Sequence, residues 1–253
     1  MKLASGYRAF WEAAHKNYPD QTKPGGNLDW IIAISSIVNG ECSDRFAKPS
    51  ERGWASYFHA KLFPNRSTKV GALAQTYKGL LNIKTPFDLH LYTRLIWELQ
   101  PQTILELGSL QGGSGLWFAD QMSVLCDNKG GVHSFDINTE CIHEDAIHPM
   151  LKFHQVDLSD VSNFDQDLLV NLPHPWIVVD DANIEIFPVF SYLSQFLLSG
   201  DYYVIEDATM RADKEIIDGL ELVEQSRFLV DTYYTDAFGT NLTCAPNAWL
   251  RKS

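Results

Sequence analysis

Two pairs of acidic residues close two short apolar stretches of the chain. Asp180 and Asp181 end WIVVDD (176–181), and Glu206 and Asp207 end YYVIEDA (202–208). If these stretches are neighbouring strands of a parallel sheet, their carboxylates meet at its carboxyl end and repel one another unless a cation neutralises them. Oxygen ligands of this kind suit Mg²⁺ or a similar ion. The alternative is that they are surface acids following buried strands.

A glycine-rich segment follows a third apolar stretch. TILELG (103–108) runs through Ser109-Leu110-Gln111 into Gly112-Gly113-Ser114-Gly115. Glycines at the carboxyl end of a strand let backbone amides approach a ligand, although a tight turn without a ligand is also consistent with them. Leu110 stands where a dinucleotide fingerprint needs its second glycine, which argues against NAD.

Asp136 closes the next apolar stretch, GVHSFDI (131–137). A carboxylate at this place accepts hydrogen bonds from both hydroxyls of a ribose. Asp157, in KFHQVDL (152–158), is expected at the same crevice. Alone, either aspartate is more simply a solvated strand-end residue, but together with the glycine segment they predict a nucleoside-like ligand.

The elements that must position these residues alternate along the chain from about Leu99 onward. The five apolar stretches are predicted strands, and alternation with helices is typical of a parallel sheet covered on both faces. Another helix is predicted to begin at Thr85-Pro86, because threonine caps and proline suits the first turn. The remaining helices are predicted over residues 113–125, 141–149, 160–172, 187–198 and 211–224, and two closing strands over 227–234 and 247–253 form a hairpin at the sheet edge. Residues 1–84 are interpreted as a helical cap on a main domain of residues 85–253.

Composition excludes several classes of function. The 253 residues are 45% hydrophobic and carry a formal charge of −12, which disfavours binding to nucleic acid. The four cysteines form no C-x-x-C pair, so neither a zinc site nor a disulfide framework is expected. No apolar run is long enough for a membrane span or a signal sequence, so we expect a cytoplasmic protein.

Taken together, these residues resemble class I S-adenosylmethionine-dependent methyltransferases over residues ~85–253. More narrowly, KTPFDLHLYTRLIWELQPQTILELGSLQGGSGLWFAD, VIEDA and DAFGTNLTCAPNAWLRK resemble the cephalosporin-hydroxylase-like family, which is associated with O-methylation of natural products and sugars. ELGSLQGGS is also similar to the loop of catechol O-methyltransferase, a magnesium enzyme. The resemblance implies an α/β, Rossmann-like sheet of seven strands, mostly parallel, with an antiparallel C-terminal strand.

The resemblance also implies the residues of the site. Metal would be held by Asp180, Glu206 and Asp207, and would lower the pKa of an acceptor hydroxyl and align its oxygen. The implied contacts to S-adenosylmethionine come from Glu106, Gly108, Ser109, Gly112, Ser114, Asp136 and Asp157.

The catalytic positions are expected at Asp180, Asp181 and Asn183. Related metal-dependent methyltransferases have a lysine or histidine base where this chain has Asn183, and asparagine takes no proton at neutral pH. Deprotonation must then depend on the metal alone or on another group, for which the candidates are Asp181, Glu185 and His59.

These observations predict a Mg²⁺-dependent O-methyltransferase that acts on a hydroxyl of a small-molecule natural product or sugar. The family resemblance suggests a homo-oligomer. Two alternatives stay open. One is a metal-independent N- or carboxyl-methyltransferase in which the acids are structural, and the other is a non-catalytic subunit that binds the cofactor.

Overall fold

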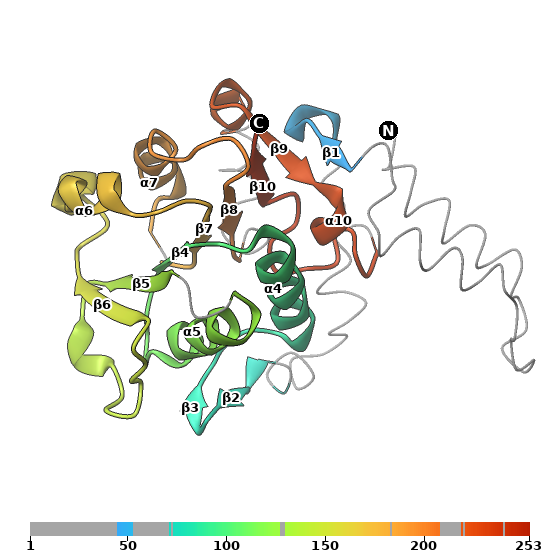
Figure 1. Ribbon diagram of the computed structural model, residues 1–253. Coiled ribbons are helices and arrows are strands. Elements are labelled where there is room, and N and C mark those ends of the chain that lie inside the picture. Colours follow the sequence, from blue (N-terminus) through green and yellow to red (C-terminus); the bar gives the residue numbers. More distant parts are fainter. Residues whose placement is uncertain are drawn as a thin grey trace, which may run out of the picture.

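The computed structural model describes residues 45–52, 71, 73–126, 130–182, 184–207, 219, 221–239 and 241–253 (Figure 1). Its strands are β1 (Phe46–Ala47), β2 (Thr76–Tyr77), β3 (Leu80–Leu81), β4 (Thr103–Leu107), β5 (Gly131–Asp136), β6 (Leu151–Gln155), β7 (Trp176–Asp180), β8 (Tyr202–Ile205), β9 (Phe228–Asp231) and β10 (Trp249–Lys252). Its helices are α4 (Pro86–Leu99), α5 (Gly113–Leu125), α6 (Gln166–Asn171), α7 (Ile186–Leu193) and α10 (Thr232–Thr235), with 3₁₀ turns η1 (Pro49–Glu51), η3 (Thr139–Cys141) and η4 (Val161–Asn163).

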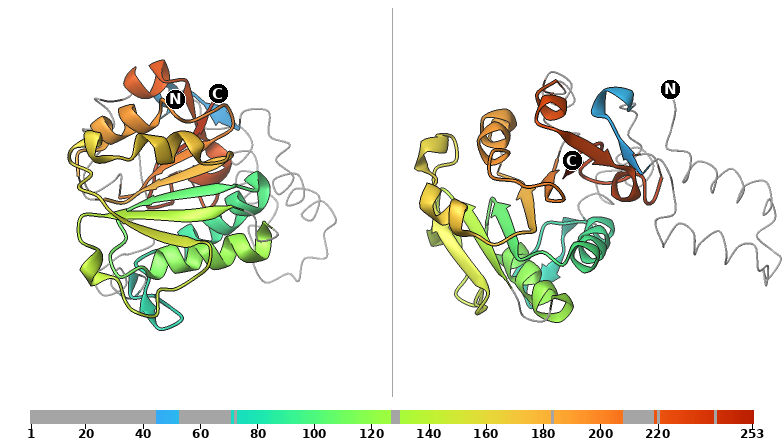
Figure 2. Two further views of the ribbon diagram at one scale, coloured as in Figure 1. Left: turned by 60° about the vertical axis from the view of Figure 1, so that its left-hand side comes forward. Right: turned by 45° about the horizontal axis from the view of Figure 1, so that its top comes forward.

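Eight of the described strands form one sheet in the order β1-β9-β10-β8-β7-β4-β5-β6. The five strands from β8 to β6 run parallel, and β10 lies antiparallel between β8 and β9. α4 and α5 cover one face, and α6 and α7 cover the other (Figure 2). The predicted Rossmann-like sheet with an antiparallel C-terminal strand is therefore confirmed. β1 adds one strand beyond the seven expected and lies outside the closing pair.

Local sequence explains the elements that flank the site. Thr85 caps α4, because its side chain accepts a hydrogen bond from the Asp88 backbone N–H, and Pro86 occupies the first turn. α4 ends at Leu99, and Gln100, its C-cap residue, adopts a left-handed conformation. β4, β7 and β8 are buried along their whole length, as expected for central strands covered on both faces.

The helix predicted over residues 141–149 is wrong. The chain makes the turn η3 and then bends through this segment. Nδ1 of His143 accepts from the Asp145 backbone N–H (3.2 Å), and Nδ1 of His148 accepts from that of Met150 (3.1 Å). These side chains take backbone donors that a helix would need.

Two further predicted elements are interrupted by aspartates that begin a new helix or turn. The helix over 160–172 is divided into η4 and α6, because Asp160 and Asp165 each cap a new N-terminus. The strand over 227–234 ends at Asp231, whose carboxylate accepts from the Tyr233 N–H and begins α10. Of the helix predicted over 211–224, only 219 and 221–224 are described, and they are helical.

Most of the predicted cap, residues 1–84, lies outside the described residues. What is described there includes β1, which pairs with β9, and the β2–β3 hairpin, which lies against α5. In the described part of the chain, no helix combines the length and apolar character needed to cross a membrane.

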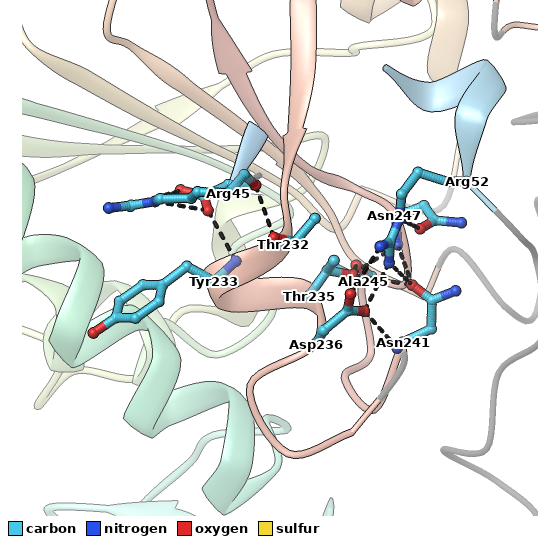
Figure 3. Close-up of polar contacts among 10 residues, drawn as sticks. Arg45, Arg52, Thr232, Tyr233, Thr235, Asp236, Asn241, Ala245 and Asn247 are labelled. Atoms are coloured by element: carbon cyan, nitrogen blue, oxygen red, sulfur yellow. Dashed lines mark hydrogen bonds and ion pairs between the residues drawn. The ribbon is translucent and has the colours of Figure 1, made fainter. Parts of the chain in front are cut away.

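Two arginines tie segment 45–52 to the C-terminal part of the chain (Figure 3). Arg45 binds both carboxylate oxygens of Asp231, at 2.9 and 2.7 Å. Arg52 binds both oxygens of Asp236, at 2.8 and 2.7 Å, and donates from Nε to Asn247 (2.8 Å). The side chains of Arg52 and Asp236 are 3% and 4% exposed, so neither charge has water as a substitute partner.

We expect Asp236→Ala to lower the free energy of unfolding by about 3–5 kcal/mol, because it leaves the Arg52 guanidinium buried without its carboxylate. Urea denaturation measures the change. Lys78→Met is the control, since the pair between Lys78 and Asp120 involves a lysine that is 55% exposed, and its unfolding midpoint should match that of the wild type. Equal midpoints for Asp236→Ala and the wild type would contradict the structural role of Arg52.

Candidate active site

A cavity of about 310 Å³ lies at the carboxyl ends of the central parallel strands. Gly108 follows β4, Asp136 ends β5, Asp181 follows β7, and Glu206 follows β8, and all four line the cavity. Because β8, β7, β4 and β5 are consecutive in the sheet, residues far apart in sequence meet here. This is the crevice in which open α/β sheets bind ligands.

The glycine segment is shaped by close packing. Gly108 has φ +98°, and a Cβ at this position would lie 2.7 Å from the backbone oxygen of Asp181. Gly112 has φ +84° and begins α5, and a Cβ there would meet the ring of Phe153 at 2.8 Å. Of the two, Gly108 lines the cavity, whereas Gly112 is explained by its contact with β6.

Asp136 holds the glycine segment in place. Its Oδ2 accepts from the backbone N–H groups of Ser109 (2.8 Å) and Leu110 (3.1 Å), and its Oδ1 accepts from Asn138 N–H (3.0 Å). The carboxylate is thereby fixed at the cavity wall. Its oxygens are hydrogen-bond acceptors of the kind that ligand hydroxyls require, and binding of a ribose by Asp136 stays a prediction.

Glu106, Ser109 and Ser114 lie behind this wall and do not line the cavity. Glu106 is buried, and its Oε2 accepts from the hydroxyl of Ser134 at 2.5 Å. Its Oε1 has no hydrogen-bond partner among the described residues. Burial raises the pKa of Glu106, although nearby Lys84 opposes the rise.

Three of the four acidic strand-end residues, Asp181, Glu206 and Asp207, line the cavity, whereas Asp180 is buried and does not line it. Tyrosines bind the carboxylates of Asp180 and Glu206. Tyr203 donates to Oδ2 of Asp180 (2.6 Å), and Tyr92 donates to Oε1 of Glu206 (2.6 Å). Asp180 and Glu206 are 4% and 6% exposed. Asp207 has φ +53° and lies on the cavity surface beside Glu206.

Lys84 is the functional candidate that sequence reasoning missed. Its ammonium lies 2.8 Å from Oε2 of Glu206 and 3.4 Å from Oδ2 of Asp181, and its side chain is only 2% exposed. Burial alone lowers the pKa of Lys84, but the charges of Glu206 and Asp181 outweigh it and raise the pKa above its ordinary value. Lys84 therefore stays charged. The one sequence signal was its place directly before the Thr-Pro start of α4.

The crowded carboxylates thus already have a cation. Burial raises the pKa of Asp181, and the Lys84 ammonium opposes that rise. Among the residues that the structure describes, no three His, Cys, Asp or Glu side chains are arranged to hold a metal ion. The repulsion that suggested a metal in the sequence is at least partly relieved by Lys84.

Other predicted positions lie apart from the cavity or outside the described residues. Asp157 is on the surface, and its Oδ1 accepts from the backbone and hydroxyl of Ser159 (3.0 and 2.6 Å). It does not line the cavity. Glu185 precedes α7 as its N-cap residue and also does not line the cavity. Asn183 and His59 fall outside the described residues.

Comparison with known proteins identifies one family model, Rhamnosyl O-methyltransferase/CmcI, which matches residues 72–253. The Rhamnosyl O-methyltransferase of Mycobacterium tuberculosis H37Rv is 24% identical over 237 residues, which cover 87% of this chain and 93% of that protein. The Mycobacterium leprae Rhamnosyl O-methyltransferase is 26% identical over 140 residues, 53% of this chain and 61% of that protein. Among solved structures, the Mg-SAM form of CmcI has a TM-score of 0.63 at 23% identity and covers 91% of this chain and 97% of that one.

We expect Gly108→Ala to destabilise the protein more than Gly79→Ala, the matched control. Both glycines have a positive φ, so both substitutions carry a backbone penalty of about 1–2 kcal/mol. A Cβ at Gly79 meets nothing within 4 Å, whereas one at Gly108 approaches the Asp181 backbone at 2.7 Å. Urea unfolding should therefore show an additional loss of about 1–3 kcal/mol for Gly108→Ala. Equal losses would mean that the close approach of β4 and β7 is unimportant.

Proposed function

Because the chain belongs to the Rhamnosyl O-methyltransferase/CmcI family and is an S-adenosylmethionine-dependent methyltransferase, we propose that it methylates a hydroxyl of a small-molecule acceptor with the help of Mg²⁺. The proposed acceptor is a sugar or another natural product. The observation that carries the proposal is a single cavity with two chemically different walls. Gly108 and Asp136 form one wall, and Asp181, Glu206 and Asp207 form the other.

The first wall suits the cofactor. Asp136 would accept hydrogen bonds from the ribose hydroxyls, and the absence of a side chain at Gly108 lets the backbone approach the ligand. Glu106 is buried behind this wall, so its contact with the cofactor stays a prediction from the family resemblance. When bound, S-adenosylmethionine supplies the electrophilic methyl group, and the protein supplies orientation and electrostatics.

The second wall suits a hard cation and the acceptor. Glu206 and Asp207 on this wall, with Asp180 buried behind it, would hold Mg²⁺, since oxygen donors are what it prefers. The tyrosine hydroxyls on Asp180 and Glu206 fit the outer partners that orient metal-binding carboxylates. The ion would lower the pKa of the acceptor hydroxyl. Asp181, whose carboxylate lies on the cavity surface, is the proposed proton acceptor.

A specific observation also favours a second candidate, metal-independent methyl transfer to a nitrogen or a carboxylate. The ammonium of Lys84 provides positive charge to Glu206 and Asp181 without a metal. In that case the acids and Lys84 form a structural charge cluster. A cytoplasmic location and a homo-oligomeric state remain predictions from the sequence.

Asp136→Ala should weaken S-adenosylmethionine binding by about 10- to 100-fold, because it removes charged hydrogen bonds to the ligand and releases the backbone of Ser109 and Leu110. Isothermal titration calorimetry measures the dissociation constant. Asp157→Ala is the matched control, since this strand-end aspartate is exposed and outside the cavity, and its affinity should equal that of the wild type. A larger loss for Asp157→Ala than for Asp136→Ala would place the ribose elsewhere.

Chelation should abolish methylation of rhamnosides and other hydroxylated glycosides, and Mg²⁺ should restore it. Asp180→Asn should lose more than about 100-fold in kcat, with little change in cofactor affinity, because it removes a ligand of the ion that activates the hydroxyl. Methyl transfer from labelled S-adenosylmethionine provides the rate. Wild-type turnover that withstands chelation, with Asp180→Asn equally active, would favour the metal-independent reaction.

A further inference from the structure

Lys84 reaches the acidic cluster from outside the main sheet. It lies between β3 and the Thr85 cap of α4, and its side chain runs past the rings of Tyr92 and Phe118, whose centroids are 5.9 and 6.0 Å from the ammonium. These aromatic neighbours and the low exposure keep water from the charge. A buried ammonium of this kind requires carboxylate partners.

The ammonium and a tyrosine each donate to one oxygen of Glu206, a carboxylate that is also proposed to hold the metal. Oε2 of Glu206 accepts from Lys84 at 2.8 Å, and Oε1 accepts from Tyr92 at 2.6 Å. Both oxygens therefore already have a donor. A divalent ion bound to Glu206 would lie close to the Lys84 ammonium, because both would contact the same carboxylate. Two cations this close together repel each other strongly inside a protein.

Asp181 offers the ammonium another partner. Its Oδ2 is 3.4 Å from Nζ, longer than the contact to Glu206, and it belongs to the neighbouring strand end. Asp181 is also outside the set of carboxylates expected to hold the metal. A small movement of the ammonium toward Asp181 would release Glu206 without leaving a buried charge unpaired.

We propose that Lys84 is an internal competitor of the divalent cation, which pairs with Glu206 when no metal is bound and moves to Asp181 when the metal takes Glu206. Lys84 acts through Glu206, so it is a positioning residue. The proposal depends on the proposed metal site. Its consequence is that metal binds weakly to the free enzyme, while the carboxylates remain neutralised and in place.

The test measures metal affinity directly, with Mn²⁺ as a paramagnetic probe of the purified full-length chain. Lys84→Gln keeps a side chain able to donate a hydrogen bond but removes its charge, and it should bind Mn²⁺ at least about 10-fold more tightly than the wild type. Lys78→Gln, at the surface pair with Asp120, is the charge-matched control and should leave the affinity unchanged. Tyr92→Phe removes the other donor to Glu206 without altering charge and should change the affinity by less than about 3-fold.

A second variant examines the movement to Asp181. Asp181→Asn should weaken Mn²⁺ binding in the wild-type background more than in the Lys84→Gln background, because only a charged Lys84 needs the alternative partner. Near-ultraviolet circular dichroism checks that each variant is folded. If Lys84→Gln does not fold, Lys84→Met with and without Asp181→Asn gives the same comparison, because it also removes the charge and keeps a side chain of similar length.

The outcomes separate the two hypotheses. If the wild type binds Mn²⁺ as tightly as Lys84→Gln does, or more tightly, the role of Lys84 is overturned and the metal site is not affected. Absence of binding to every variant overturns the metal site and this inference with it, while S-adenosylmethionine binding by the same samples still tests the cofactor site. Tighter binding by Lys84→Gln, with equal effects of Asp181→Asn in both backgrounds, supports competition and overturns the movement.

Discussion

The active-site end of the sheet depends on one buried ammonium. Glu206 and Asp181 both contact Lys84, and the pKa of Lys84 is raised further by Glu106, so carboxylates from three consecutive strands share its charge. Without a cation, parallel strands that each end in an acid would bring like charges together in a poorly hydrated place. The ammonium comes from the segment before α4, and the carboxylates come from the ends of the strands. The two charges therefore neutralise each other only when the start of α4 is packed against this edge of the sheet.

A second constraint is the close approach of β4 and β7. The Asp181 backbone oxygen lies where a side chain at position 108 would stand. The loop after β4 can therefore lie against the end of β7 only if it begins with glycine. Asp136 on the next strand then holds the loop through the amides of Ser109 and Leu110. The same contacts that stabilise the loop therefore place the carboxylate on the cavity wall. The atoms that hold the loop are therefore also those proposed to bind the ligand.

Local signals predicted the elements whose causes are local. Thr85 and Pro86 mark the start of α4, and the glycines mark the start of α5, because caps and turns involve residues within a few positions of one another. The helix over 141–149 was wrong for an equally local reason, since histidine side chains there compete for backbone donors. Lys84 was missed because its partners are 97 and 122 residues away, and no spacing rule reaches that far. Arg52 and Asp236, separated by 184 residues, were missed in the same way.

The case of Lys84 also limits what charge repulsion can identify. Clustered carboxylates at one sheet edge require positive charge, and that step from sequence to electrostatics holds here. It does not decide whether the charge is a bound ion or a side chain, because a lysine brought in by topology satisfies the same requirement. What distinguishes the two is the geometry around each oxygen. Glu206 has donors on both of its oxygens, so a metal at this edge must share or displace a partner that the protein already provides.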